Sequence, residues 1–150
     1  MSKYLARPAY QTKSVPGLGT PARRSVADVS FNANPASGQY VAVMSQNGSS
    51  TSWVSAGGTS LATPQWAALL AVANALRTQS SLGMIGAPHN ALYASVASVA
   101  KLYVADFLDI KSGKDGSCSL CAAKTGYDNP SGLGTPQGVS LLSTLAGVTV

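Results

Sequence analysis

The feature that most constrains the fold is an apolar stretch that follows two glycines near the middle of the chain. Nearly every residue in 61–76 is apolar or small, and Gly57-Gly58 stands just before it. Two glycines allow the backbone to turn tightly. Pro64 falls where the first turn of a helix tolerates a missing N–H. The pattern predicts a helix that begins near Ser60 and is buried on most sides.

A serine at the start of such a helix has two possible roles. The first N–H groups of a helix are unpaired and the dipole there is positive, so an oxyanion is stabilised, which suits a nucleophile. The other role is capping, in which Ser60 or Thr59 satisfies one of those N–H groups. On chemistry alone capping is favoured, because it is the commoner role of such residues.

The particular residues of this stretch favour the nucleophile role over the capping role. Gly58-Thr59-Ser60-x-Ala62-x-Pro64 closely resembles the nucleophile segment of subtilisin-like serine peptidases. The double glycine and the continuation through Trp66 are more similar to the sedolisin, or serine-carboxyl peptidase, branch. Further segments resemble that family, namely Arg24–Ser30 with Asn34-Pro35 and Gly38, Asp109-Ile110, Gly126–Asp128 and Gly132–Pro136. Ala27 stands where the family usually has proline, and the resemblance covers roughly residues 23–145.

The resemblance implies an α/β fold, in which a subtilisin-like parallel sheet is sandwiched by flanking helices. This chain would supply only the C-terminal part, over residues 25–150, with 1–24 as a loop or a linker into the domain. Ser60 would be the nucleophile, a glutamate the general base and an aspartate its orienting partner. A further upstream aspartate would help form the oxyanion hole. The implied activity is hydrolysis of a peptide or protein substrate at acidic pH by an exported enzyme.

Most of that catalytic machinery is absent from the sequence. The chain has five acidic residues, all of them aspartates, and no glutamate. Asp28, the only one before Ser60, matches a structural segment of the family. A serine is a weak nucleophile without a base, so the chain alone is predicted to be inactive and to need the missing N-terminal part as its partner. His89 follows Ser60, which breaks the order of a subtilisin triad, so it is interpreted as a surface or capping histidine.

Two carboxylates bracket a long loop rich in Gly, Ser and Lys. Such a loop is unusual in a compact domain unless something holds it, and calcium takes six to eight oxygen ligands. By resemblance, the carboxylates of Asp109 and Asp128 and the backbone carbonyls of Ile110, Lys124 and Gly126 form a Ca²⁺ site. Lys124 departs from the glycine usual there. An EF-hand is excluded because no glutamate is available to close it.

Cys118 and Cys121 form a Cys-x-x-Cys inside the same loop. A zinc site is disfavoured because no further ligands have recognisable spacing. A thioredoxin-like pair should follow a strand and open a helix, whereas Gly116, Ser117 and Ser119 flank this one. A local disulfide in an exported protein is the first choice, and two free thiols come next.

Charge and hydropathy exclude two classes of partner. Only 10% of residues are charged, and the net charge of +5 comes from scattered Lys and Arg. No aromatic residues interleave with a basic cluster, so nucleic acid is not predicted as a partner. No apolar run is long enough to span a membrane, and residues 1–13 lack the apolar core of a secretory signal.

The remaining patterns predict a small set of elements. A strand over 25–31 and a stronger one over 39–44 are expected to pair as a hairpin, followed by a polar loop over 46–52. A helix is expected from Pro88 with Leu92, Val96 and Val99 on one face, then an extended segment over 104–110. Thr135-Pro136 is expected to start a last helix whose inner face bears Leu141, Leu142 and Leu145.

Two other functions remain open. One is a non-catalytic remnant of the fold, a calcium-stabilised structural or binding module. The other is a fragment of a subtilisin-like peptidase, which Trp66 and the loop between Asp109 and Asp128 disfavour. In each case truncation exposes strand edges and an apolar helix face, so the isolated chain is expected to aggregate or to need a partner.

Overall fold

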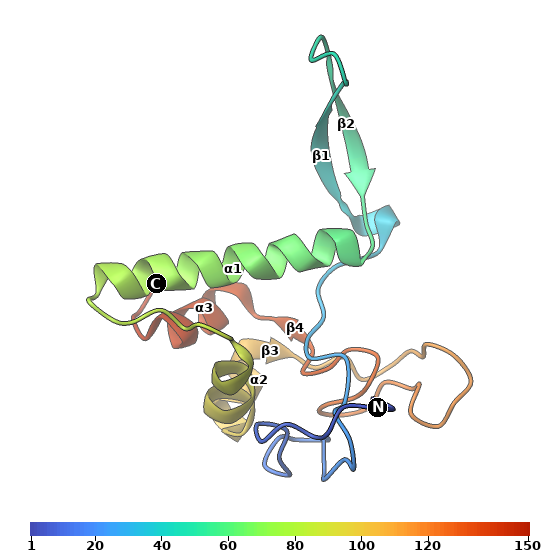
Figure 1. Ribbon diagram of the computed structural model, residues 1–150, viewed down its shortest axis with the longest axis vertical. Helices are drawn as coiled ribbons and strands as arrows, with labels where there is room; N and C mark the ends of the chain where they lie inside the picture. The colour runs from blue at the N-terminus through green and yellow to red at the C-terminus, as the bar shows by residue number, and fades with distance from the viewer. The chain divides into compact units, whose positions relative to one another are not determined.

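The chain divides into two compact units in the computed structural model, which describes all residues 1–150. The larger unit comprises Met1–Ser30 and Leu69–Val150, and the smaller unit comprises Phe31–Ala68. One long helix, α1 (Thr59–Gln79), begins in the smaller unit and ends in the larger (Figure 1). The two units are described separately below.

The smaller unit contains a short 3₁₀ helix, η1 (Pro35–Ser37), and a hairpin of two antiparallel strands, β1 (Gln39–Met44) and β2 (Thr51–Ala56). The pairing runs from Gln39 opposite Ala56 to Met44 opposite Thr51. The expectation that β1 pairs with residues 25–31 is therefore wrong. The turn decides the pairing, because the Ser45 N–H donates to the Ser50 carbonyl at 2.9 Å and returns the chain directly alongside β1.

The helix predicted from the apolar stretch is confirmed as α1, but its burial is not. Leu61, Trp66 and Ala73 are buried, whereas Val72 is 49% exposed and many alanines between them face solvent. A helix that is apolar all round needs neighbours on every side, and few positions of α1 have them here. Pro64 also lies inside the helix rather than in its first turn.

The larger unit contains a π-helix, η2 (Ala91–Ala97), the helices α2 (Ala100–Asp106) and α3 (Gly138–Ala146), and two short strands. The strands β3 (Phe107–Leu108) and β4 (Thr135–Pro136) pair antiparallel. Both sheets of the chain are thus antiparallel and two-stranded, and the expected parallel sheet is not present in it. A parallel pair requires a crossover connection, and here each pair is closed by a turn or a loop.

The core of the larger unit is built from η2, α2, α3 and the loops around them. Its most buried apolar side chains are Val15, Ala73, Leu92, Tyr93, Val96, Ala97, Tyr103, Phe107, Tyr127, Leu133, Leu141, Leu145 and Ala146. The inner faces predicted for the last two helices are therefore largely confirmed, except that Val99 is 44% exposed. The expected start of the last helix at Thr135-Pro136 is wrong, because these residues form β4 and α3 begins at Gly138. The extended segment expected over 104–110 is wrong at its start, because α2 continues to Asp106.

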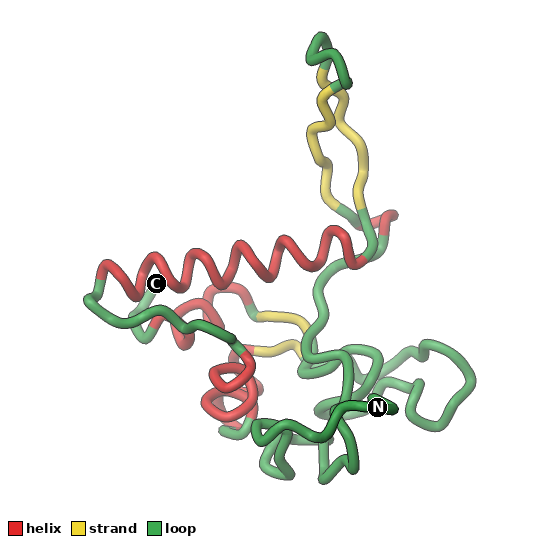
Figure 2. Tube along the Cα trace, viewed as in Figure 1, coloured by secondary structure: helices red, strands yellow, loops and turns green.

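Two long stretches have almost no regular structure, residues 1–24 and the loop 109–134 (Figure 2). The N-terminal stretch nevertheless packs into the larger unit, since Gln11 and Val15 are each only 1% exposed. The domain boundary placed at residue 24 stays a prediction. Neither α1 nor any other helix combines the length and the hydropathy that a membrane span requires.

The strand expected over 25–31 is not formed, although the segment is bonded to a neighbour. The Ala27 N–H donates to the Asn129 carbonyl at 3.0 Å, and the Asp28 carbonyl accepts from the Leu133 N–H at 2.9 Å. The partner is a series of turns, in which Gly132 (φ 63°) comes so close that a Cβ would lie 2.3 Å from the Asp28 backbone. A turning partner cannot continue a ladder, so the alternating pattern ends as an extended loop.

The larger unit is expected to lose stability in alkali. Burial is the main cause that raises the pKa of Tyr93, Tyr103 and Tyr127. The folded chain therefore keeps protons that the unfolded chain loses, so the free energy of unfolding falls as pH rises past about 10. Tyrosinate absorbance and circular dichroism, followed together through an alkaline titration, check this. The prediction fails if all the tyrosines ionise while the helical signal persists.

Candidate functional site

Ser60 lies in the first turn of α1, held there by the glycines before it. Gly58 adopts φ 78°, its N–H donates to the Ala33 carbonyl at 2.6 Å, and its carbonyl accepts from the Leu61 and Ala62 N–H groups at 3.0 and 3.2 Å. Pro64 has no backbone N–H, so it cannot donate the usual helical hydrogen bond to the carbonyl of Ser60. Ser60 thus sits at the positive end of the helix dipole with its side chain exposed.

The Ser60 hydroxyl has no base in its own unit. Residues 31–68 contain no Asp, Glu, His, Lys or Arg. No hydrogen bond joins the hydroxyl of Ser60 or Thr59 to a backbone N–H, so neither residue caps the helix by its side chain. The geometry provides a nucleophile position with a favourable dipole and leaves proton transfer to groups outside the smaller unit.

In the larger unit, the two predicted carboxylate ligands converge on one stretch of backbone. An oxygen of Asp109 accepts from the Gly126 N–H at 2.9 Å, and an oxygen of Asp128 accepts from the Lys124 N–H at 3.0 Å. The other Asp128 oxygen accepts from the backbone and the hydroxyl of Ser131, both at 2.8 Å. The structure therefore brings together both carboxylates and the stretch 124–126 that supplies two of the predicted carbonyls.

These two carboxylates have no cationic partner. Both ion pairs in the chain involve Asp28, while Asp128 is only 3% exposed. The Lys124 ammonium turns away and donates to the Gly17 carbonyl at 2.9 Å. A buried charge is costly unless it is paired or binds a metal. Nowhere do three His, Cys, Asp or Glu side chains gather, so further ligands at this place would be carbonyl, hydroxyl or water oxygens. The set fits calcium, which prefers oxygen.

The N-terminal stretch packs against this loop at Pro16 and Gly17. The Tyr127 N–H donates to the Pro16 carbonyl at 2.7 Å. Gly17 has φ 77°, and a Cβ on it would lie 2.6 Å from the Tyr127 nitrogen and 2.8 Å from the Thr125 carbonyl oxygen. Only glycine permits this approach.

Replacing Gly17 by alanine is therefore expected to destabilise the larger unit by about 2 kcal/mol. Gly19→Ala is the matched control, because Gly19 also has a positive φ (65°) but nothing lies within 4 Å of a Cβ there. Urea unfolding of both variants separates the close contact from the backbone strain that they share. Equal losses in the two variants would show that the contact with Tyr127 contributes nothing.

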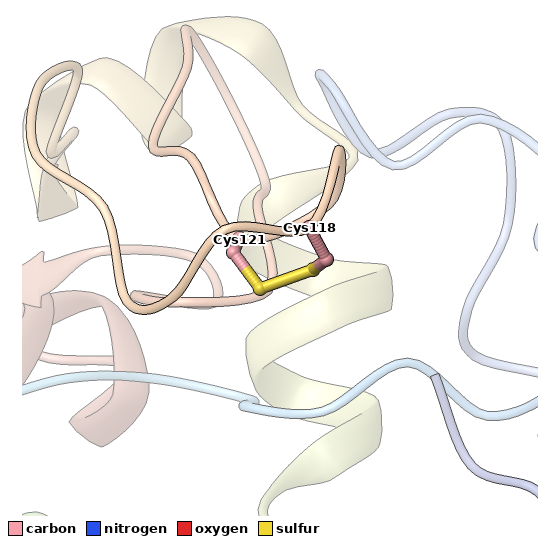
Figure 3. Close-up of a disulfide and its surroundings, with 2 residues drawn as sticks. All are labelled: Cys118 and Cys121. Atoms are coloured by element: carbon pink, nitrogen blue, oxygen red, sulfur yellow. A yellow bond between two sulfur atoms is a disulfide. The ribbon is translucent and has the colours of Figure 1, made fainter.

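Cys118 and Cys121 form a disulfide at the tip of the loop, as first expected from the sequence (Figure 3). The Cys121 carbonyl accepts from the Asp115 N–H at 2.8 Å, and the Ala123 N–H donates to the Gly113 carbonyl at 2.9 Å. These contacts fold the tip back on itself. The disulfide therefore closes a small local turn, and both cysteines lie outside the group of carboxylates.

A third polar cluster was not singled out from the sequence. One Asp28 oxygen accepts from Arg24 at 2.5 Å and the other from the Tyr93 hydroxyl at 2.8 Å. Arg24 also donates to the Tyr10 hydroxyl at 2.6 Å, and although burial opposes it, the Asp28 carboxylate raises the pKa of Arg24. His89 stacks on Tyr10, and its Nε2 lies 3.7 Å from Asp28. The contacts span 65 residues of sequence, and no local pattern signals them.

Comparison with known proteins gives one similarity and one absence. The chain is 33% identical over 135 residues to sedolisin from Pseudomonas sp. (strain 101), a match that covers 89% of this chain and 20% of that protein. No protein-family model matches the chain. The resemblance to sedolisin that the motifs indicate is thus confirmed, at a distance. The chain spans about a fifth of the length of the curated relative it matches.

Proposed function

We propose that the chain is the C-terminal part of a serine-carboxyl endopeptidase domain of the sedolisin type. The observation that carries the proposal is Ser60 itself, set by Gly57-Gly58 at the start of α1 within a sequence that is 33% identical to sedolisin. In the assembled enzyme the Ser60 oxygen attacks the scissile carbonyl carbon of a peptide. Its proton passes to a glutamate, which gives it to the leaving amine as the C–N bond breaks, and water then hydrolyses the acyl-enzyme and restores the Ser60 hydroxyl.

The glutamate, its aspartate partner and the oxyanion aspartate would come from the missing N-terminal part. The exposed hairpin supports such a partner, because Tyr40, Met44 and Trp53 are each more than 60% exposed and both strands have a free edge. An isolated two-stranded hairpin is marginally stable in water. The missing part would also supply the parallel sheet that this chain lacks. The Cys118–Cys121 disulfide supports an exported parent enzyme.

Calcium is proposed as a structural ion of the larger unit. Its ligands would be the Asp109 and Asp128 carboxylates with the carbonyls of Ile110, Lys124 and Gly126. Two converging carboxylates without a cationic partner support this assignment. The ion would supply positive charge that holds the loop 109–128 closed, and no catalytic step passes through it.

A non-catalytic remnant is the second candidate, and one observation favours it. The chain contains no glutamate, so the chemistry depends wholly on another polypeptide segment. If that segment does not exist, the chain is a calcium-stabilised module that keeps part of the fold.

Co-expression of the chain with the portion of a sedolisin that lies outside the matched region tests the proposal. A complex that co-elutes on size exclusion and hydrolyses peptides at acidic pH is the expected result, whereas the chain alone should hydrolyse nothing. The proposal would be contradicted, and the non-catalytic remnant favoured, if the chain is a monodisperse, cooperatively melting monomer that does not bind the added portion.

A further inference from the structure

Tyr103 is a buried polar side chain whose role no motif explains. It lies in α2 with only 4% of its surface exposed, and its ring packs against Phe107 with 5.9 Å between centroids. Its hydroxyl is shielded from solvent and completes no hydrogen bond of ordinary geometry. A buried tyrosine hydroxyl usually has a partner, and leaving it without one is costly.

The surroundings of this hydroxyl point to the carboxylates. Tyr103, Asp109 and Gly126 line one cavity of about 340 Å³. Burial raises the pKa of Tyr103 most, and the negative charges of Asp109 and Asp128 raise it further, with Asp109 also within reach as an acceptor for the hydroxyl proton. A phenol hydroxyl has one proton to donate, and an ionised carboxylate only accepts, so the hydroxyl and the Asp109 carboxylate in this cavity are complementary.

Asp109 has an oxygen to spare for this proton. One of its oxygens accepts from the Gly126 N–H at 2.9 Å, and no hydrogen bond of the chain occupies the other. Asp128, by contrast, is held by three donors, the Lys124 N–H and the backbone and hydroxyl of Ser131. Asp109 is therefore the carboxylate whose orientation is less constrained, and Tyr103 is the group that can constrain it.

We propose that Tyr103 is a positioning residue of the calcium site, where its hydroxyl donates to the Asp109 carboxylate and keeps it turned toward the stretch 124–126. The inference rests on the proposed calcium site. Removing a residue that hydrogen-bonds to a metal ligand and orients it commonly lowers metal affinity by 10-fold or more. The competing role is purely structural, in which the ring packs α2 and the hydroxyl contributes nothing to the site.

The test is calorimetric titration of the full chain with Ca²⁺, comparing Tyr103→Phe with the unmodified protein. Phenylalanine keeps the ring and its packing on Phe107, so only the hydroxyl is lost. Tyr40→Phe is the control, because Tyr40 is 75% exposed on β1 in the other unit. We expect the Kd for Ca²⁺ to rise about 10-fold in Tyr103→Phe and to stay unchanged in the control. The melting temperature without calcium should be similar in all three proteins.

A second variant isolates the interaction itself. In an Asp109→Asn background, Tyr103→Phe is expected to weaken calcium binding no further, because the carboxylate that it orients is gone. Unchanged affinity in Tyr103→Phe would overturn the positioning role, as would a loss of melting temperature that is equal with and without calcium. If the unmodified chain takes up no Ca²⁺, the calcium site itself fails and the inference falls with it, and that result appears before any variant is compared.

Discussion

Peptide hydrolysis at acidic pH is expected to fall by at least about 10⁴-fold when Ser60→Ala is introduced into the chain assembled with its missing N-terminal part. No other side chain in the proposed mechanism can act as the nucleophile that becomes acylated. The rate enhancement that remains from substrate binding and an oxyanion site is far below that of a working enzyme. Steady-state cleavage of a quenched peptide by the assembled complex measures the effect. Ser117→Ala, at an exposed position in the loop 109–134 of the other unit, should change the rate less than about twofold.

The chain without that partner should hydrolyse nothing at acidic or neutral pH, with or without Ser60. This expectation follows from the lack of any base in residues 31–68 and of any glutamate in the whole chain. Acid activity of the chain alone that disappears in Ser60→Ala would contradict it. Such a result would mean that one of the five aspartates, or a second copy of the chain, takes the proton.

The largest effect on stability is expected from Asp28→Ala, at about 3 kcal/mol. The substitution leaves the Arg24 guanidinium, whose side chain is 18% exposed, without its carboxylate partner. It also removes the acceptor of the Tyr93 hydroxyl, which lies in a residue with no exposed surface. For a chain of this length such a loss corresponds to a fall of about 6–12 °C in melting temperature.

Asp115→Ala is the control for this prediction, because Asp115 is exposed and its side chain makes no ion pair. It should change the unfolding free energy by less than about 0.5 kcal/mol. Urea unfolding followed by circular dichroism measures both variants. If Asp28→Ala and Asp115→Ala unfold at the same urea concentration, the ion pair and the tyrosine contact contribute nothing net.

Local patterns predicted the parts of this protein that depend on neighbours in the sequence. The helix α1 follows from an uninterrupted apolar stretch after Gly57-Gly58, and the disulfide follows from two cysteines three residues apart in a loop. The two carboxylates of the calcium proposal were also found, because they bracket a loop that needs support. The assignments of Ser60 as a nucleophile and of the calcium ligands stay predictions.

The parts that were missed depend on distant partners. The strand β2 begins with Thr51 and Ser52, which the predicted loop over 46–52 included, and its sequence Thr-Ser-Trp-Val-Ser-Ala shows no polar–apolar alternation. Polar and apolar residues alternate along a strand when one of its faces is buried, and neither face of this hairpin is covered, so this signal is lacking. The contact of Tyr93 with Asp28 joins segments 65 residues apart that no periodicity relates. Treating residues 104–110 as extended also hid the helix that places Tyr103.

The electrical neutrality of residues 31–68 has a consequence for the proposed peptidase function. A nucleophile that arrives on a segment without carboxylates, imidazoles or amines brings no acid–base titration of its own to the reaction. In chimeras built from this segment and different upstream donors, the pH–rate profile should therefore follow the donor. Acid optimum and nucleophile would then be inherited from separate stretches of polypeptide, which could be exchanged independently.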